Sequence, residues 1–100
     1  MSKIIIDSAR AQNVIGSSED RRKGSWIKYW EKYTGRKART CSYLGCSNQA
    51  DVGGHLFLAR YSRQYTYITA ICYSCNNQKH QDGEYYDMKS NVAYVKIETI

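Results

Sequence analysis

Four cysteines form two close pairs, and this arrangement is typical of a zinc site. Four residues separate Cys41 from Cys46, two separate Cys72 from Cys75, and 25 lie between the pairs. A close pair on a tight turn directs two sulfurs at one point, so two such pairs can surround one Zn²⁺ with four thiolates. Two disulfides are the alternative, and they would need an oxidising compartment. We expect structural zinc that supplies much of the folding free energy of so short a chain.

The compartment expected for this chain also favours a metal over disulfides. No apolar run approaches the roughly 18 residues that a membrane-spanning helix needs. The apolar stretch at residues 4–6 is closed at once by Asp7, which makes it too short for a secretory signal. We therefore expect a cytoplasmic, reducing environment and no membrane contact, in which the cysteines remain available to zinc.

A second group of polar side chains lies close to the cysteines in sequence. His55 stands in the run Gly-Gly-His-Leu-Phe-Leu, and Asn76 and His80 follow the second cysteine pair. On a helix through residues 72–80, Asn76 and His80 would share one face and could hold a catalytic Mg²⁺, Mn²⁺ or second Zn²⁺. His55 could then act as a general base that takes a proton from water. Structural roles remain open for each: a backbone hydrogen bond for His55, zinc ligation or surface exposure for His80, and helix capping for Asn76.

The positive charge of the chain is concentrated in its first part. The net charge is +6, and residues 1–40 hold ten Lys and Arg against four Asp and Glu, whereas residues 41–100 hold five of each. Such an excess predicts contact with nucleic acid, DNA above all, or with an acidic protein partner; a solvated basic face is the alternative. The candidate contacts are Arg21, Arg22, Lys23, Arg36, Lys37, Arg39, Arg60, Arg63 and Lys79.

The first part of the chain is expected to form an arm and a helix. Residues 1–24 read as a strand or arm followed by a polar, basic linker, with a loop or short helix over residues 9–14. Residues 25–40 read as an amphipathic helix with a basic end, capped by Ser25 and stopped by Gly35. Its aromatic residues recur at helical spacing, and we expect them to be core. They are Trp26, Tyr29, Trp30 and Tyr33.

Residues 41–100 are expected to form a zinc module with a C-terminal strand, within a single domain. Its elements are a knuckle at the first cysteine pair, hairpin strands at 52–58 and 67–71, a helix from the second pair through about residue 80, and a strand at 92–97. Gly45 permits the sharp turn of the knuckle. The order knuckle, β-hairpin, helix defines a treble clef. The predicted fold class is therefore α+β: a small zinc-stabilised treble clef with an N-terminal basic and aromatic helical extension.

With this order, residues 41–80 resemble the HNH, or ββα-metal, nuclease family. His55 stands at the family's first-strand position, and the run Cys-Tyr-Ser-Cys-Asn-Asn-Gln-Lys-His looks like the family's Cys-x-x-Cys-His/Asn-x-x-Lys-His ending. The resemblance implies metal-dependent phosphodiester hydrolysis, with His55 as the base and Asn76 and His80 as ligands. This chain departs from the family pattern at Gly54, where many members carry Asp.

Three functions remain open at this point. The first is an HNH-type endonuclease that acts on DNA. The second is a non-catalytic treble clef that binds or inhibits, such as a phage or mobile-element adaptor, with a nucleic-acid or protein partner. The third is a structural zinc protein that associates through its aromatic helix. Asp51 and Asp82 are the only carboxylates nearby in the sequence that are candidates for a catalytic site, and the oligomeric state is left open.

Overall fold

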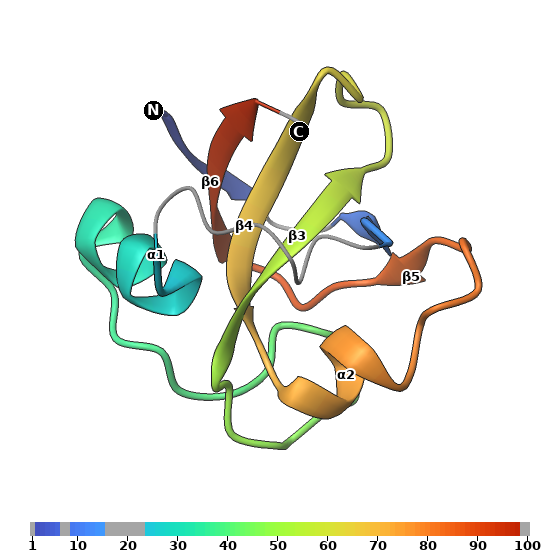
Figure 1. Cartoon of the computed structure of the whole chain (residues 1–100), viewed down its shortest axis with the longest axis horizontal. Helices are drawn as coiled ribbons and strands as arrows, with labels where there is room; N and C mark the ends of the chain where they lie inside the picture. Colours follow the sequence, from blue (N-terminus) through green and yellow to red (C-terminus); the bar gives the residue numbers. More distant parts are fainter. Residues whose placement is uncertain (1, 7–8, 16–23, 99–100) are drawn as a thin grey trace.

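A six-stranded sheet, in which every neighbouring pair is antiparallel, forms the centre of the molecule (Figure 1). The computed structural model describes residues 2–6, 9–15 and 24–98, so Arg21, Arg22 and Lys23 lie outside the described residues. The elements are β1 (Ser2–Ile6), β2 (Arg10–Asn13), α1 (Trp26–Thr34), β3 (Val52–Leu58), β4 (Tyr65–Ile71), α2 (Tyr73–Asn77), β5 (Tyr86–Asp87) and β6 (Val92–Glu98). The sheet order is β1-β6-β4-β3-β2-β5. The prediction of a small α+β fold is confirmed.

Helix α1 covers one face of the sheet with its aromatic side chains. Trp26, Tyr29 and Trp30 are buried, and they form one core cluster with residues of the central strands such as Ile68 and Val95. The indole Nε1 of Trp30 donates to a backbone carbonyl oxygen of β6, that of Ala93, at 2.8 Å. These contacts confirm the core prediction for three of the four residues of the aromatic stripe, and the prediction is wrong for Tyr33, which is exposed.

The ends of α1 are those expected from the sequence. The Ser25 side chain accepts from the backbone N–H of Lys28, and Gly35 adopts a left-handed conformation with φ of 72° and closes the last turn. Tyr33, the fourth aromatic residue of the stripe, is exposed. The helix therefore ends where the aromatic contacts with the sheet also end.

Gly53 allows α1 to lie directly on the backbone of β3. A Cβ atom at this position would stand 2.6 Å from the backbone nitrogen of Ile27 and 2.7 Å from the carbonyl oxygen of Trp26. Both atoms belong to backbone, which cannot rotate away as a side chain can. Glycine is therefore needed here for the helix to approach the strand.

The second core cluster occupies the opposite face of the sheet. Successive residues of a strand point to opposite faces, and on β4 Ile68 belongs to the α1 cluster while Tyr67 and Ile71 belong to the second one. This second cluster also contains Tyr43 and three of the four cysteines. The segment that carries the cysteines is thus fixed against the sheet by apolar packing.

Two local predictions are wrong. Residues 9–14 include strand β2 rather than a loop or short helix, because pairing with β3 lets alternate side chains, Ala11 and Asn13, enter the core. Helix α2 ends at Asn77 instead of continuing to about residue 80: Gln78 has φ of −123° and His80 has φ of 55°, both outside the helical region.

The described residues include no helix long and apolar enough to cross a membrane.

Candidate metal centre and its surroundings

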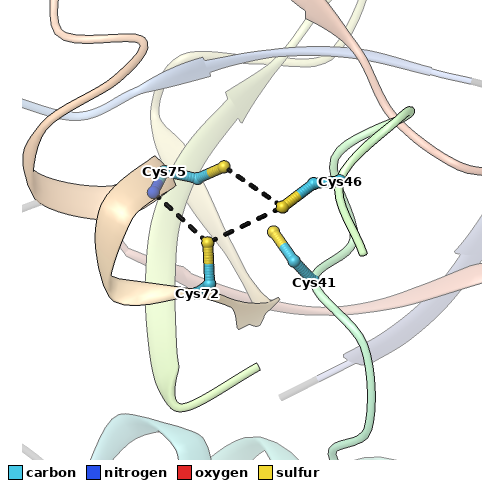
Figure 2. A group of neighbouring side chains, drawn as sticks. All are labelled: Cys41, Cys46, Cys72 and Cys75. Carbon is cyan, nitrogen blue, oxygen red and sulfur yellow. Dashed lines mark hydrogen bonds between the residues drawn. The ribbon is translucent and has the colours of Figure 1, made fainter. Parts of the chain in front are cut away.

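The four cysteine sulfurs converge on one point between the start of α2 and the segment before β3. Every pair of these Sγ atoms lies within 4.8 Å, and Figure 2 shows the four side chains turned toward one another. The Sγ of Cys46 lies 3.8 Å from that of Cys72 and 3.9 Å from that of Cys75. Zn–S bonds of about 2.3 Å in a tetrahedron place the sulfurs about 3.8 Å apart. The cluster is thus a possible metal site whose spacing fits structural zinc, and all four cysteines are free of disulfides.

Tight turns aim each cysteine pair at this point. In the first pair, Gly45 has φ of 84°, and the backbone N–H of Cys46 donates to the carbonyl oxygen of Tyr43 at 3.1 Å. In the second pair, Cys72 is the N-cap of α2, and its Sγ accepts from the backbone N–H of Cys75. Each pair is therefore held by a hydrogen bond within its own turn.

The thiols differ in acidity because their surroundings differ. Burial acts to raise the pKa of Cys72, but hydrogen bonds from the Cys75 backbone N–H and the Asn48 side-chain amide outweigh it and lower the pKa to about 7. Burial raises the pKa of Cys41 and of Cys75. Four thiolates this close repel one another, so a divalent cation is the natural partner for them.

Lys89 ties the centre to the chain segment before β6. Its Nζ donates to the carbonyl oxygen of Cys41 at 2.7 Å and to that of Cys46 at 2.6 Å. The ammonium group thus bridges the backbone carbonyls of both cysteines of the first pair. The sequence analysis missed Lys89, because nothing in the sequence links it to cysteines more than 40 positions earlier.

Asn13 is a second residue that the sequence analysis missed. Its Nδ2 donates to the carbonyl oxygens of Cys75 at 2.9 Å and of His80 at 3.2 Å, while its Oδ1 accepts from the Tyr43 hydroxyl at 2.7 Å. Asn13 is buried. One amide on β2 therefore links both cysteine-bearing segments.

The three residues expected to form a catalytic site do not all meet. His55 is 4% exposed on β3, with its ring centroid 4.6 Å from that of Trp26. Asn76 lines the same hollow as His55, together with Asp51. His80 instead lies between two tyrosine rings, 4.3 Å from Tyr43 and 4.1 Å from the ring of Tyr86.

The prediction that Asn76 and His80 share a helix face is wrong because α2 ends before His80. Burial lowers the pKa of this histidine. Beside His55, a Cβ at Gly54 would overlap the Ile71 side chain and lie 3.3 Å from the Asn76 Oδ1. An apolar side chain thus fills the space where the resemblance places a ligand. Within the described ranges, the cysteines form the only group of three or more His, Cys, Asp or Glu residues close enough to hold a metal.

A basic hollow of about 390 Å³ adjoins the metal centre. Its cationic lining consists of Arg36, Lys37, Arg39 and Lys89. No aspartate or glutamate lines it among the residues that the structure describes, and the nearby Glu31 carboxylate accepts from the backbone N–H of Ala38 at 2.7 Å. Arg36, Lys37 and Arg39, which the sequence predicts as nucleic-acid contacts, thus line one hollow together with Lys89.

The remaining cationic candidates lie elsewhere. The guanidinium of Arg63 is held over the ring of Phe57 at 3.9 Å and donates to the Gln12 Oε1 at 2.9 Å. Arg60 is exposed in the loop between β3 and β4, and Lys79 is exposed just after α2. These three side chains do not join the basic hollow.

Comparisons of the chain with protein-family models, with curated proteins and with solved structures found no match.

Proposed function

We propose that the chain is a zinc-stabilised treble-clef protein that binds nucleic acid through the basic hollow and does not cut it. The single observation that carries this proposal is the basic hollow itself. Arg36, Lys37, Arg39 and Lys89 line one concavity beside the cysteine cluster, and concentrated cations of this kind bind phosphates of the nucleic-acid backbone.

The order of the elements supports the treble-clef part of the proposal. Cys41 and Cys46 precede β3, the hairpin of β3 and β4 leads away from the cluster and back to it, and Cys72 opens α2. Zinc would join the two ends of this hairpin and so stabilise the sheet together with the metal centre.

The charges in the hollow are available to a phosphate. Lys37 and Arg39 are exposed, and neither forms an ion pair within the described residues. The Arg36 guanidinium donates to the carbonyl oxygen of Asn91 at 2.7 Å, which fixes its position and leaves further N–H donors. A phosphate could therefore be held by one fixed guanidinium and two adaptable cations.

The side chains around His55 favour binding without cleavage. The Ile71 side chain fills the space beside Gly54 in which the HNH resemblance places a metal ligand. His80 packs against the rings of Tyr43 and Tyr86. A catalytic cation would need oxygen or imidazole ligands that converge.

The experiment is a salt titration of DNA binding with paired variants. The double variant Lys37→Gln/Arg39→Gln should make the negative slope of log affinity against log salt shallower by about two, because two phosphate contacts are lost. The matched control, Lys28→Gln/Lys32→Gln, removes equal charge from exposed positions of α1 outside the hollow. Equal loss in both variants, or binding that ignores salt, would contradict the proposal.

An HNH-type endonuclease is the second candidate, and one observation favours it. His55 and Asn76 line the same hollow as the Asp51 carboxylate, so this hollow holds the residue types, a base and two oxygen donors, that such a nuclease would use. Plasmid nicking with added Mg²⁺ or Mn²⁺ decides between the candidates. Nicking that the His55→Ala variant loses, at unchanged zinc content and fold, would establish the nuclease and overturn binding without cleavage.

A further inference from the structure

A second hollow lies at the other end of α1, with a lining unlike that of the basic hollow. Its volume is about 330 Å³, within the range of roughly 300–1,000 Å³ usual for small-molecule sites. Residues at the start of α1, around the start of β3 and on α2 line it. The side chains that matter here are Trp26, Asp51, His55, Tyr73, Asn76 and Asn77. We call it the aromatic hollow.

The aromatic hollow has one accessible ring, that of Tyr73, beside the buried rings of Trp26 and His55. Tyr73 on α2 is 55% exposed, so its ring is accessible to a ligand. Trp26 stands on the α1 side, with the His55 ring set edge-on to it at 81°. Exposed aromatic faces bind other flat rings by stacking.

Hydrogen-bonding groups line the same hollow. Asn76 and Asn77 are three and four positions after Tyr73, which places all three on one face of α2. Asp51 contributes a carboxylate that is exposed and has no hydrogen bond or ion pair within the described residues. The described lining holds no lysine or arginine. It therefore suits a flat ring that donates hydrogen bonds better than a phosphate.

We propose that the aromatic hollow takes one unpaired nucleobase that carries an exocyclic amino group, guanine above all. Tyr73 stacks on the ring, the Asp51 carboxylate accepts from the ring N–H and amino group of guanine, and the Asn76 amide bonds the rest of the base edge. Thymine has no amino group to offer the carboxylate, so it binds more weakly. This inference rests on the proposed function and names the form of nucleic acid, a single strand, that the protein prefers.

The position of α1 links the two hollows. Trp26 lines the aromatic hollow and Trp30 lines the basic hollow, and the step of four positions from one to the other corresponds to about 6 Å along a helix axis. One strand of nucleic acid can therefore place a phosphate in the basic hollow and a nearby base in the aromatic hollow.

The test compares short oligonucleotides of equal backbone charge, without added divalent metal. The host is a fully abasic oligonucleotide, and its variants carry a single central guanine or a single central thymine. We expect guanine to tighten binding about tenfold over the abasic host, as one stacked base does, and thymine to tighten it less. Equal, salt-sensitive binding of all three would overturn the base site and leave the basic hollow standing. Absence of salt-sensitive binding to any of them would overturn both proposals.

Paired variants locate the effect in the aromatic hollow. Tyr73→Ala should abolish the advantage of guanine over the abasic host, whereas Tyr73→Phe, which keeps the ring, should retain it. Asp51→Asn should remove the preference for guanine over thymine, whereas Glu84→Gln, which removes an exposed carboxylate outside the hollow, should not. Zinc content and circular dichroism confirm that each variant is folded. A guanine advantage that survives both Tyr73→Ala and Asp51→Asn would overturn the assignment to this hollow.

Discussion

Replacing Lys89 by methionine removes the ammonium group that bridges the first cysteine pair. In the native protein its Nζ donates to the carbonyl oxygens of Cys41 and Cys46 at 2.7 and 2.6 Å. Hydrogen bonds from a charged donor contribute about 1.5–3 kcal/mol each, and water can replace part of them because the site is only half-buried. We expect a loss of about 3 kcal/mol in zinc binding, or about a hundredfold in affinity.

Competition with a chromogenic zinc chelator measures this affinity. The control is Lys28→Met, which changes an exposed lysine on α1 and should leave zinc affinity unchanged. Lys89→Met should also be more readily unfolded by chelator, because zinc binding and folding are coupled. A zinc affinity for Lys89→Met within about threefold of the native value would refute the role assigned to Lys89.

Three further substitutions test the packing of α1 on β3, the hydrogen bonds of Asn13 and the protonation of His80. Gly53→Ala should destabilise the zinc-loaded protein to urea by about 3 kcal/mol, because its Cβ would press on the backbone of Trp26. Asn13→Ala should cost about 3 kcal/mol in the same assay, since it leaves the Tyr43 hydroxyl and two backbone carbonyls without their partner. His80→Phe should flatten the loss of stability on acidification. Burial lowers the pKa of this histidine in the folded state, so the unfolded state binds more protons and stability falls as the pH drops below about 6.5.

Each of these three has a clear contrary result. A native unfolding midpoint for the Gly53→Ala variant would mean that α1 can move away from β3 at no cost. A native midpoint for the Asn13 variant would mean that water replaces its hydrogen bonds. For His80, thermal melts of the native protein and the His80→Phe variant are compared at several pH values. Both proteins lose zinc in acid, so the difference between their curves gives the contribution of His80 to the pH dependence of stability. Parallel curves would contradict the pH dependence assigned to it.

Local patterns in the sequence were enough to predict the cysteine cluster and α1. Two cysteines a few residues apart are typical of a tight turn that binds a metal. Trp26, Tyr29 and Trp30 recur at the spacing of one helical turn. The strands on either side of the loop near residue 60 were also expected, although β4 begins at Tyr65, two residues earlier. These features depend on neighbours in the chain, which the sequence displays directly.

The remaining features depend on partners that are distant in the sequence. Strand β2 exists because β3 pairs with it, although its own residues, such as Ala11 and Gln12, have little strand preference. Helix α2 ends at Asn77 with no proline or glycine at that point, and His80 just beyond it stacks on Tyr43, which lies far earlier in the chain. The same holds for Lys89, whose partners are backbone carbonyls that carry no side-chain signature.

The pairing of β1 with β6 makes the first and last strands neighbours, with Ser2 opposite Lys96. Folding rates fall as contacts join residues more distant in the chain, because loop closure must precede the contact. Because β1 pairs with β6 and with no other described strand, this pair can form only after β6 has been made, whereas β3 and β4 lie next to each other in the chain. Until that pair forms, the edge of β6 that faces β1 is unpaired, and exposed strand edges favour aggregation.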